Sequence, residues 1–356
     1  MVDLQKGIKI IHYEVLKTFC TRVLVKVGVP AQEAQVIVDS LLDADLRGIG
    51  SHGVLRLPTY VKRVRLGLMK AKAEYDYLAD TPTITFIDGK LSFGQILGTV
   101  AIRIAIEKAR KAGIALSVIR NGSHFGAAGY YAMKAAQNRL IGIVLTNTAP
   151  VIPAHGGASA VVGNNPISIA VPTSIENRSI VLDAAMSEAA VGKIILAKEK
   201  GEPIPLTWAT DKDGVPTSDP TEALKGLMLP TGGYKGFGLA FVFEILTGVL
   251  SGSDFSIRVK SVYKNFDAPQ RVGQFMVVID PSVFMEYEMF VKKVDEFCEL
   301  IKTSPKRAGV DTLFFPGEIE FNTWNQRTKE GIPVSLNILR ELNELASNIG
   351  VKERLE

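Results

Sequence analysis

The chain has 356 residues, of which 47% are hydrophobic and 22% are charged, a balance typical of a folded globular protein. Its 41 basic and 37 acidic residues are interspersed and give a net charge of +4, without the lysine- and arginine-rich block of a nucleic-acid-binding surface. Prolines and glycines interrupt the longest uncharged stretch, residues 140–175, which excludes a membrane-spanning helix there. We expect a soluble, cytoplasmic protein without a metal site, whose two cysteines, Cys20 and Cys298, are buried thiols.

The first 70 residues predict three helices. Apolar residues recur at helical spacing over residues 16–27 and again over 34–42, and the second helix is expected to end near Arg47-Gly48. The third helix is predicted to begin between Ser51, a candidate N-cap, and Leu55.

Strands and helices alternate in the middle of the chain. The β-branched segment 83–87 runs into Asp88-Gly89, a turn signal typical of a hairpin. Further strands are predicted at 114–119, 141–145, 167–171, 179–182 and 274–279, and helices at 100–111, 128–138, 237–250, 290–302 and 336–349. We therefore expect an α/β domain over residues 79–284 and a helical domain built from both chain ends, residues 1–78 and 285–356.

The segment Gly48-Ile49-Gly50-Ser51-His52-Gly53 matches the dinucleotide-binding pattern G-x-G-x-x-G. That pattern binds a pyrophosphate where a buried strand precedes it and a helix begins at its third glycine. Here Asp39, Asp43 and Asp45 precede it at helical intervals. We predict a helix before Gly48 and no Rossmann-type cradle in residues 40–60.

The same segment carries three side chains with useful chemistry. In a helix that begins near Ser51, His52, Arg56 and Tyr60 would share one face because they lie four residues apart. A guanidinium binds a carboxylate through paired hydrogen bonds, and an imidazole transfers protons near neutral pH. This face suits an anionic, oxygen-rich ligand, although a solvated helix face has the same spacing.

Two glycine-rich loops are further candidates. His124 lies in Gly122-Ser123-His124-Phe125-Gly126, between a predicted strand and a predicted helix, where α/β enzymes often carry function; a turn histidine is the alternative. The segment 231–238 precedes a helix, and its N–H groups and Lys235 could hold a phosphate, although a flexible turn has the same composition. His12 is expected at the surface and His155 in a loop.

Five motifs in chain order carry a family resemblance. They are Asp45-Leu46-Arg47-Gly48 with Ser51-His52-Gly53-Val54 and Arg56-Leu57, then Ser123-His124-Phe125-Gly126-Ala127-Ala128-Gly129-Tyr130-Tyr131, Gly163-Asn164-Asn165-Pro166, Pro230-Thr231-Gly232-Gly233-Tyr234-Lys235-Gly236 and Pro316-Gly317-Glu318. Over nearly the whole chain they resemble the type-2 malate/L-lactate dehydrogenase family, which includes sulfolactate and ureidoglycolate dehydrogenases.

The resemblance implies a fold, an assembly and a set of site residues. The fold would be a non-Rossmann, mostly antiparallel α/β domain packed with a helical domain, in a homodimer. His52 and His124 would be the acid/base candidates, with Ser51 and Asp183 orienting one of them, and Arg56 and Tyr60 would face the substrate. The cofactor-binding residues would be His124, Thr148, Asp183, Lys235, Gly236, Pro316, Gly317 and Glu318.

The implied reaction is hydride transfer between a nicotinamide cofactor, NAD or alternatively NADP, and a small 2-hydroxy acid, with malate or lactate leading. Sulfolactate, ureidoglycolate or a cyclic imino acid are alternatives, and an anion-binding protein without turnover is the alternative of another class. Residues 163–166 read Gly-Asn-Asn-Pro, so Asn164 stands where the family usually has the threonine of Gly-Thr-Asn-Pro. Residues 184–187 read Ala-Ala-Met-Ser where the family usually has Met-Ala-Thr-Ser. Both departures fall where the cofactor is expected, so the choice between NAD and NADP stays open.

Overall fold

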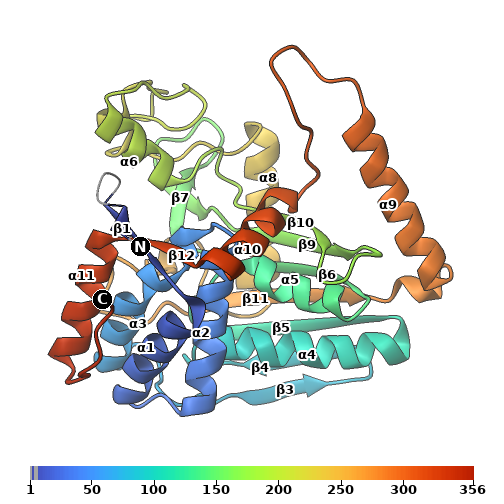
Figure 1. Ribbon diagram of the computed structural model, residues 1–356, viewed down its shortest axis with the longest axis horizontal. Helices are drawn as coiled ribbons and strands as arrows, with labels where there is room; N and C mark the ends of the chain where they lie inside the picture. Colours follow the sequence, from blue (N-terminus) through green and yellow to red (C-terminus); the bar gives the residue numbers. More distant parts are fainter. Residues whose placement is uncertain (1, 4–6) are drawn as a thin grey trace.

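One large sheet forms the centre of the computed structural model, which describes residues 2–3 and 7–356 (Figure 1). Its strands are β3 (Asp76–Asp80), β4 (Ile84–Asp88), β5 (Ile114–Gly122), β6 (Ile141–Thr146), β9 (Ile167–Pro172), β10 (Ser179–Ala184) and β11 (Val272–Ile279). They lie in the order β10-β9-β6-β11-β5-β4-β3, and among these described strands only β4 and β5 run parallel. This confirms the mixed, mostly antiparallel α/β fold expected from the sequence.

Two helices, α4 (Gly94–Ala112) and α5 (Ala128–Gln137), pack against the sheet and enclose an apolar core. Both turn alanine-rich faces toward the sheet, where Ile119, Val144 and Met276 are fully buried. Short side chains allow the helices to approach the strands closely, and removal of this apolar area from water stabilises the fold.

The start of α4 differs from the prediction, because the helix begins at Gly94 and not near residue 100. Glycine has low helix propensity, so Gly94 and Gly98 hide this first turn from a reading of apolar spacing. Close packing requires both glycines. A Cβ at Gly94 would lie 2.2 Å from the backbone oxygen of Ser123, and a Cβ at Gly98 would lie 2.7 Å from the Tyr131 ring. The loop that follows β5 therefore packs directly against α4.

The hairpin predicted after β4 is wrong. The chain leaves β4 through Gly89, Lys90 and Leu91, enters α4 and returns as β5 in parallel register with β4. A Cβ at Gly89 would lie 2.4 Å from the side chain of Leu97 in α4, so contact with that helix decides the path. A turn signal marks a change of direction, whereas tertiary packing determines which strand comes next.

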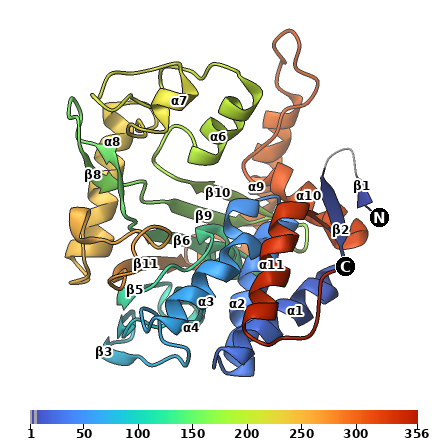
Figure 2. The same cartoon turned by 90° about the vertical axis from the view of Figure 1, so that its left-hand side faces the viewer.

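Segments from both chain ends form a helical layer beside the sheet (Figures 1 and 2). It consists of α1 (Tyr13–Lys26), α2 (Ala31–Leu46), α3 (Leu57–Arg65), α10 (Glu318–Glu330) and α11 (Leu336–Asn348), with the small sheet β1 (Val2–Asp3), β2 (Ile8–Ile11) and β12 (Ile332–Ser335). Leu16, Leu41 and Leu57 share one apolar core with Leu342 and Ala346. The expectation that both ends build the helical part is confirmed.

The domain boundaries at residues 78/79 and 284/285 stay a prediction. One helix of the C-terminal part, α9 (Tyr287–Thr303), projects beside β9 and β10 and contributes no residue to the core of the helical layer (Figure 1).

Residues 187–250 add a region that the sequence predicted only in part. It contains α6 (Val191–Lys200), α7 (Pro220–Ala223) and α8 (Tyr234–Glu244), the last continuing as a π-helical turn over Ile245–Val249, and it lies beside the hairpin of β7 (Pro150–Pro153) and β8 (Ala160–Gly163). The predicted helix at 237–250 is present, whereas α6, α7, β7 and β8 were not predicted. Within the described part of the chain, no helix is long and apolar enough to cross a membrane.

Candidate active site

The segment between α2 and α3 is built around a buried carboxylate. It forms two 3-10 turns, Gly50–His52 and Val54–Arg56, joined by an extended Gly53. Asp45, at the end of α2, accepts a hydrogen bond from the Val54 N–H at 2.8 Å, and a Cβ on Gly53 would lie 1.8 Å from its carboxylate. A helix start at Ser51 is therefore wrong, and α3 begins at Leu57, close to the alternative start near Leu55, with Pro58 in its first turn.

The G-x-G-x-x-G match has no dinucleotide-binding geometry. Helix α2 precedes Gly48, and 3-10 turns follow, so no parallel strand ends at the glycines. The prediction that residues 40–60 contain no Rossmann-type cradle is confirmed.

The two turns bring His52 against His124, which lies in the loop between β5 and α5. The imidazole rings are stacked, with centroids 5.8 Å apart and planes inclined by 14°. Ser51 Oγ lies 2.9 Å from His52 Nδ1, the contact that the expected orienting role of Ser51 requires. Two histidines separated by 72 positions in the sequence thus share one site.

Tyr60 and Gln95 occupy one side of the His124 ring. The Tyr60 hydroxyl lies 2.7 Å from His124 Nδ1, and the Gln95 side-chain N–H donates to that hydroxyl at 2.8 Å. The Gly126 N–H also donates to Nδ1, at 3.3 Å. These contacts engage Nδ1, so Nε2 is the ring nitrogen available to a ligand, and it can accept a proton when the imidazole hydrogen is on Nδ1 and points to the Tyr60 hydroxyl.

Arg56 and Tyr263 lie on the Nε2 side. The Tyr263 hydroxyl is 3.2 Å from His124 Nε2, and the Arg56 guanidinium carbon is 3.9 Å from the centre of the Tyr263 ring. Among the described residues, the hydrogen bonds of Arg56 involve only Nε, which donates to the Ser51 carbonyl at 2.6 Å. The terminal nitrogens can therefore bind a carboxylate in the fork geometry of a guanidinium.

Both histidines are neutral at pH 7. Burial, followed by the positive charge of Arg56, lowers the pKa of His52 to about 4. Burial, His52, Arg56 and Arg63 lower the pKa of His124 well below its ordinary value. No group of three or more His, Cys, Asp or Glu residues in the described ranges could hold a metal ion. The site combines one cation with two neutral imidazoles, an arrangement that attracts an anion.

Sequence reasoning missed Gln95 and Tyr263. Gln95 is fully buried in the glycine-containing first turn of α4, and Tyr263 lies in an irregular loop before β11. Neither residue belongs to a sequence motif or to an apolar pattern. Both become informative only when the fold brings them to the His124 ring.

The residues expected at the cofactor form separate groups in the structure. Asp183, on β10, accepts a hydrogen bond from Gly129 N–H at 2.9 Å and contacts neither histidine through a recorded hydrogen bond. The Pro316 carbonyl accepts from Val181 N–H at 3.0 Å, so the Pro316-Gly317-Glu318 motif runs beside the same strand. The Glu318 carboxylate forms an ion pair with Lys302 at 2.6 Å, which engages one of its oxygens.

Thr148 and the 231–238 loop make up the other expected cofactor contacts. The Thr148 hydroxyl donates to Asn164 Oδ1 at 2.7 Å, so the residue that departs from the family pattern touches an expected cofactor ligand. Lys235 is exposed and Gly236 buried in the first turn of α8, next to Gly233, whose φ of 67° suits glycine. Free N–H groups and a lysine at a helix start fit a phosphate-bearing cofactor.

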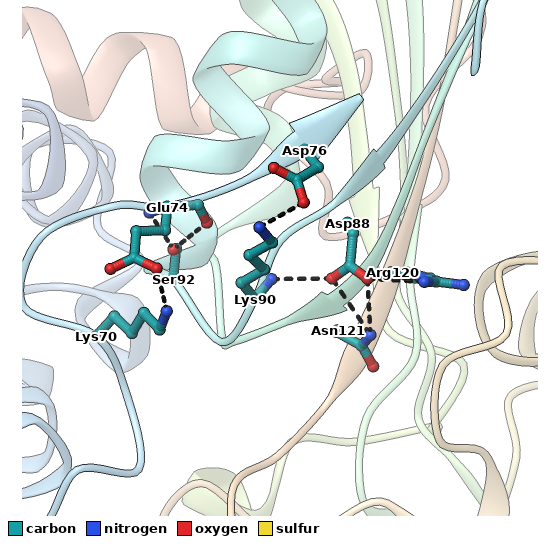
Figure 3. A network of polar contacts seen from close by, with 8 residues as sticks. All are labelled: Lys70, Glu74, Asp76, Asp88, Lys90, Ser92, Arg120 and Asn121. Atoms are coloured by element: carbon teal, nitrogen blue, oxygen red, sulfur yellow. Dashed lines mark hydrogen bonds and ion pairs between the residues drawn. The ribbon is translucent and has the colours of Figure 1, made fainter. Parts of the chain in front are cut away.

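A polar network fixes the end of β5, where the His124 loop begins (Figure 3). The Asp88 carboxylate accepts hydrogen bonds from Arg120 Nε at 2.9 Å, from Lys90 N–H at 3.1 Å and from the Asn121 amide at 3.3 Å. Partial burial acts to raise the pKa of Asp88, but these hydrogen bonds outweigh it and the pKa is lowered. An ionised Asp88 therefore braces the end of β5, two residues before His124.

Comparisons with known proteins identify the family. Residues 11–343 match the family model described as malate/L-lactate dehydrogenase. The malate dehydrogenase of Pyrococcus abyssi is 38% identical over 345 residues, covering 95% of this chain and 94% of that protein. The L-sulfolactate dehydrogenase of Methanocaldococcus jannaschii is 39% identical over 329 residues, covering 92% and 94%. An NAD(+)-dependent ureidoglycolate dehydrogenase of Escherichia coli O157:H7 is 30% identical over 332 residues, covering 93% and 94%.

Solved structures have the same fold. The sulfolactate dehydrogenase from Methanocaldococcus jannaschii superposes with a TM-score of 0.92 at 37% identity, covering 98% of this chain and 100% of that chain. A delta1-piperideine-2-carboxylate reductase from Pseudomonas syringae superposes with a TM-score of 0.84 at 27% identity, covering 95% and 100%.

Paired histidines beside an arginine whose terminal nitrogens make no hydrogen bond to the described residues are groups suited to moving protons on a small organic anion. The chain belongs to the malate/L-lactate dehydrogenase family and is a dehydrogenase, as the sequence motifs predict.

Proposed function

We propose that this dehydrogenase interconverts a small 2-hydroxy acid and its 2-oxo acid with NAD(P), malate or lactate being the leading substrates. The observation that carries the proposal is that Arg56 and His124 Nε2 both face Tyr263, at 3.9 Å and 3.2 Å. A carboxylate on Arg56 brings the C2 oxygen toward the imidazole, because C2, which carries this oxygen, is bonded directly to the carboxylate carbon in every 2-hydroxy acid.

In this mechanism the protein orients the substrate and carries one proton. Arg56 binds the carboxylate, and a neutral histidine, His124 or His52, accepts the C2 hydroxyl proton while the C2–O bond becomes a carbonyl. When bound, a nicotinamide cofactor would supply the hydride acceptor for oxidation and the hydride donor for reduction. Ser51 orients His52, and Tyr60 orients His124 through Nδ1.

The cofactor is proposed to lie along β10 and the start of α8. Lys235 and Gly236 would hold its phosphates, and Thr148, Asp183 and the Pro316-Gly317-Glu318 motif would line the remainder. NAD is our first choice and NADP the alternative. Titration of the protein with NADH and NADPH, followed by the fluorescence of the bound nicotinamide, tests this choice without any substrate.

One kinetic experiment tests the reaction. NADH or NADPH oxidation is followed with oxaloacetate, pyruvate, sulfopyruvate and a cyclic imino acid, for the wild type, His124→Ala and His52→Ala. Turnover of a 2-oxo acid, and its fall by about 10²- to 10⁴-fold in one histidine variant, is expected for general acid–base catalysis. Binding of an anion without turnover would contradict the proposal.

A cyclic imino acid is the second candidate substrate, since the superposed piperideine-2-carboxylate reductase shares the fold. Such a substrate needs the same carboxylate anchor and proton donor, with a C=N bond in place of C=O. A preference for the imino acid over every 2-oxo acid in the panel would favour this alternative.

We also propose a homodimer, because two helices expose large apolar side chains. In α8 Phe241 and Val242 are 50% and 49% exposed, and in α9 Phe297 and Leu300 are 65% and 67% exposed. Exposed apolar patches of this kind mark interaction surfaces. Light scattering should give a dimer mass for the wild type and for Val15→Asp, a control on α1, and a smaller mass for Phe241→Asp or Phe297→Asp. A monomeric wild type would contradict the dimer.

A further inference from the structure

Arg63 is a fully buried cation whose hydrogen bonds go only to backbone carbonyls. It lies on α3, has no exposed surface, and donates to the carbonyls of Val262 at 3.4 Å, Asn265 at 2.8 Å and Ala268 at 3.2 Å. No carboxylate among the described residues is within ion-pairing distance of it. Burial lowers the pKa of Arg63, as expected for a charge held without a counter-ion.

All three carbonyls belong to one irregular loop, residues 259–270, between a 3-10 turn and β11. A loop without strand or helix hydrogen bonds leaves carbonyls that need donors, and the planar guanidinium supplies several from a single side chain. Lysine carries the charge on a single nitrogen and cannot reach three separate carbonyls in this fork geometry. Arg63 therefore fixes the loop to α3.

The loop carries Tyr263, and α3 also carries Tyr60. Tyr60 and Arg63 lie three residues apart and so share one side of the helix. Tyr60 reaches His124 Nδ1 directly at 2.7 Å, whereas Arg63 acts on the Nε2 side by holding the loop whose Tyr263 hydroxyl lies 3.2 Å from Nε2. One helix thus controls both nitrogens of the same imidazole.

We propose that Tyr263 contacts the C2 oxygen of the substrate and that Arg63 is the positioning residue that holds it there. This inference rests on the proposed dehydrogenase function. Because Tyr60 engages Nδ1, the C2 oxygen must approach His124 at Nε2, the nitrogen that the Tyr263 hydroxyl faces. The hydroxyl can then donate to that oxygen, which gains negative charge as the hydride arrives during reduction. The Tyr263 ring also lies against Arg56, which restricts the approach of the carboxylate.

Tyr263→Phe tests the contact itself. It removes the hydroxyl and keeps the ring against Arg56, so we expect kcat/KM for the best 2-oxo acid to fall by about 10- to 100-fold, as for loss of a hydrogen bond to a charged group. Binding of the reduced cofactor should be unchanged. Lys264→Ala, in the same loop but exposed and outside the site, is the matched control.

Arg63→Lys tests the positioning role with a readout that needs no activity. Release of the loop should increase the rate of limited trypsin cleavage after Lys260 or Lys264 by about tenfold or more, while Tyr263→Phe leaves that rate unchanged. The kcat/KM of Arg63→Lys should fall as well. The double variant Arg63→Lys/Tyr263→Phe should lose little beyond the larger single effect, because both changes act through one hydroxyl.

The outcomes separate this inference from the proposed function. If His124→Ala or His52→Ala abolishes turnover while Tyr263→Phe keeps the wild-type kcat/KM, the contact with the C2 oxygen is wrong and the proposed function stands. Additive losses in the double variant, or an unchanged cleavage rate in Arg63→Lys, would overturn the positioning role. If Arg63→Lys does not fold, Tyr263→Phe still decides the contact. A wild type that turns over no 2-oxo acid overturns the proposed function and the contact together, and the cleavage rates then report on the loop alone.

Discussion

The Tyr60 hydroxyl and His124 Nδ1 are 2.7 Å apart, and Gln95 donates to the same hydroxyl. Gln95 is fully buried, and its side-chain oxygen has no hydrogen-bond partner among the described residues. If His124 carries its proton on Nδ1, the Tyr60 hydroxyl can accept it and donate in turn to that free amide oxygen after rotation of the amide. The Gln95–Tyr60 pair can therefore hydrogen-bond to His124 Nδ1 both when that nitrogen is unprotonated and when it carries a proton.

The first prediction concerns this pair. Gln95→Leu keeps a similar volume but removes both the N–H donor and the oxygen acceptor of the amide. The Tyr60 hydroxyl then has no partner in the side chain at position 95 for either state of His124 Nδ1. We expect kcat/KM to fall by about 3- to 30-fold, consistent with one or two hydrogen bonds of about 1 kcal/mol each, and its pH profile to shift. A stability loss without a change of the pH profile would assign Gln95 a packing role alone.

Arg56→Lys tests the carboxylate anchor. Lysine keeps the positive charge but loses the fork that matches two carboxylate oxygens, so kcat/KM should fall by about 10- to 150-fold, or about 1.5–3 kcal/mol. The affinity for the nicotinamide cofactor should hardly change. Arg65→Lys, an exposed change at the end of α3, is the control. Equal kcat/KM for both variants would remove Arg56 from the substrate site.

The lowered histidine pKa values predict opposite pH dependence in the two reaction directions. Oxidation needs a neutral imidazole, and the pKa is about 4 for His52 and lowered well below its ordinary value for His124, so kcat/KM for oxidation should stay level between pH 8 and pH 6. Reduction needs the protonated imidazole, so its kcat/KM should rise about tenfold for each unit that the pH falls. An acidic limb near pH 6.5 in oxidation would mean that the imidazole pKa is not lowered.

Asp45 gives a prediction for stability. Burial, opposed by the Val54 hydrogen bond and by Arg327, raises the pKa of Asp45 to about 7. A raised carboxyl pKa means that the folded state binds the proton more tightly than the unfolded state. The stabilisation is therefore present at low pH and is lost as the pH rises from about 4 through 7, by about 2–3 kcal/mol between pH 5 and pH 8.

Asp45→Asn should remove this pH dependence, because the amide oxygen can still accept the Val54 N–H without a charge. Urea unfolding of both proteins at pH 5 and pH 8 measures this dependence. The free energy of unfolding of the variant, relative to that of the wild type, should be higher at pH 8 than at pH 5. An equal loss of stability at both pH values would indicate that an ionised Asp45 stabilises the loop through Arg327.

The sequence by itself determined the parts of this protein that depend on local pattern and on motifs. Apolar spacing identified α1, α2 and α5, alternating β-branched segments identified most strands of the large sheet, and the aspartates before Gly48 excluded a Rossmann cradle. The ordered motifs identified the family, because they name residue types that the site chemistry requires. His52, His124, Arg56 and Tyr60 were found in this way.

Only the tertiary structure decided how these groups meet. The Asp45 carboxylate divides residues 50–56 into two turns, an interaction that no periodicity can reveal. The start of α4 was hidden because its glycines are there for contact with another segment and not for helix formation. Tyr263 reaches His124 across 139 positions of sequence and depends on Arg63, a residue whose neighbours are backbone carbonyls. Backbone carbonyls carry no sequence signal, so a site built from them becomes visible only when the chain is folded.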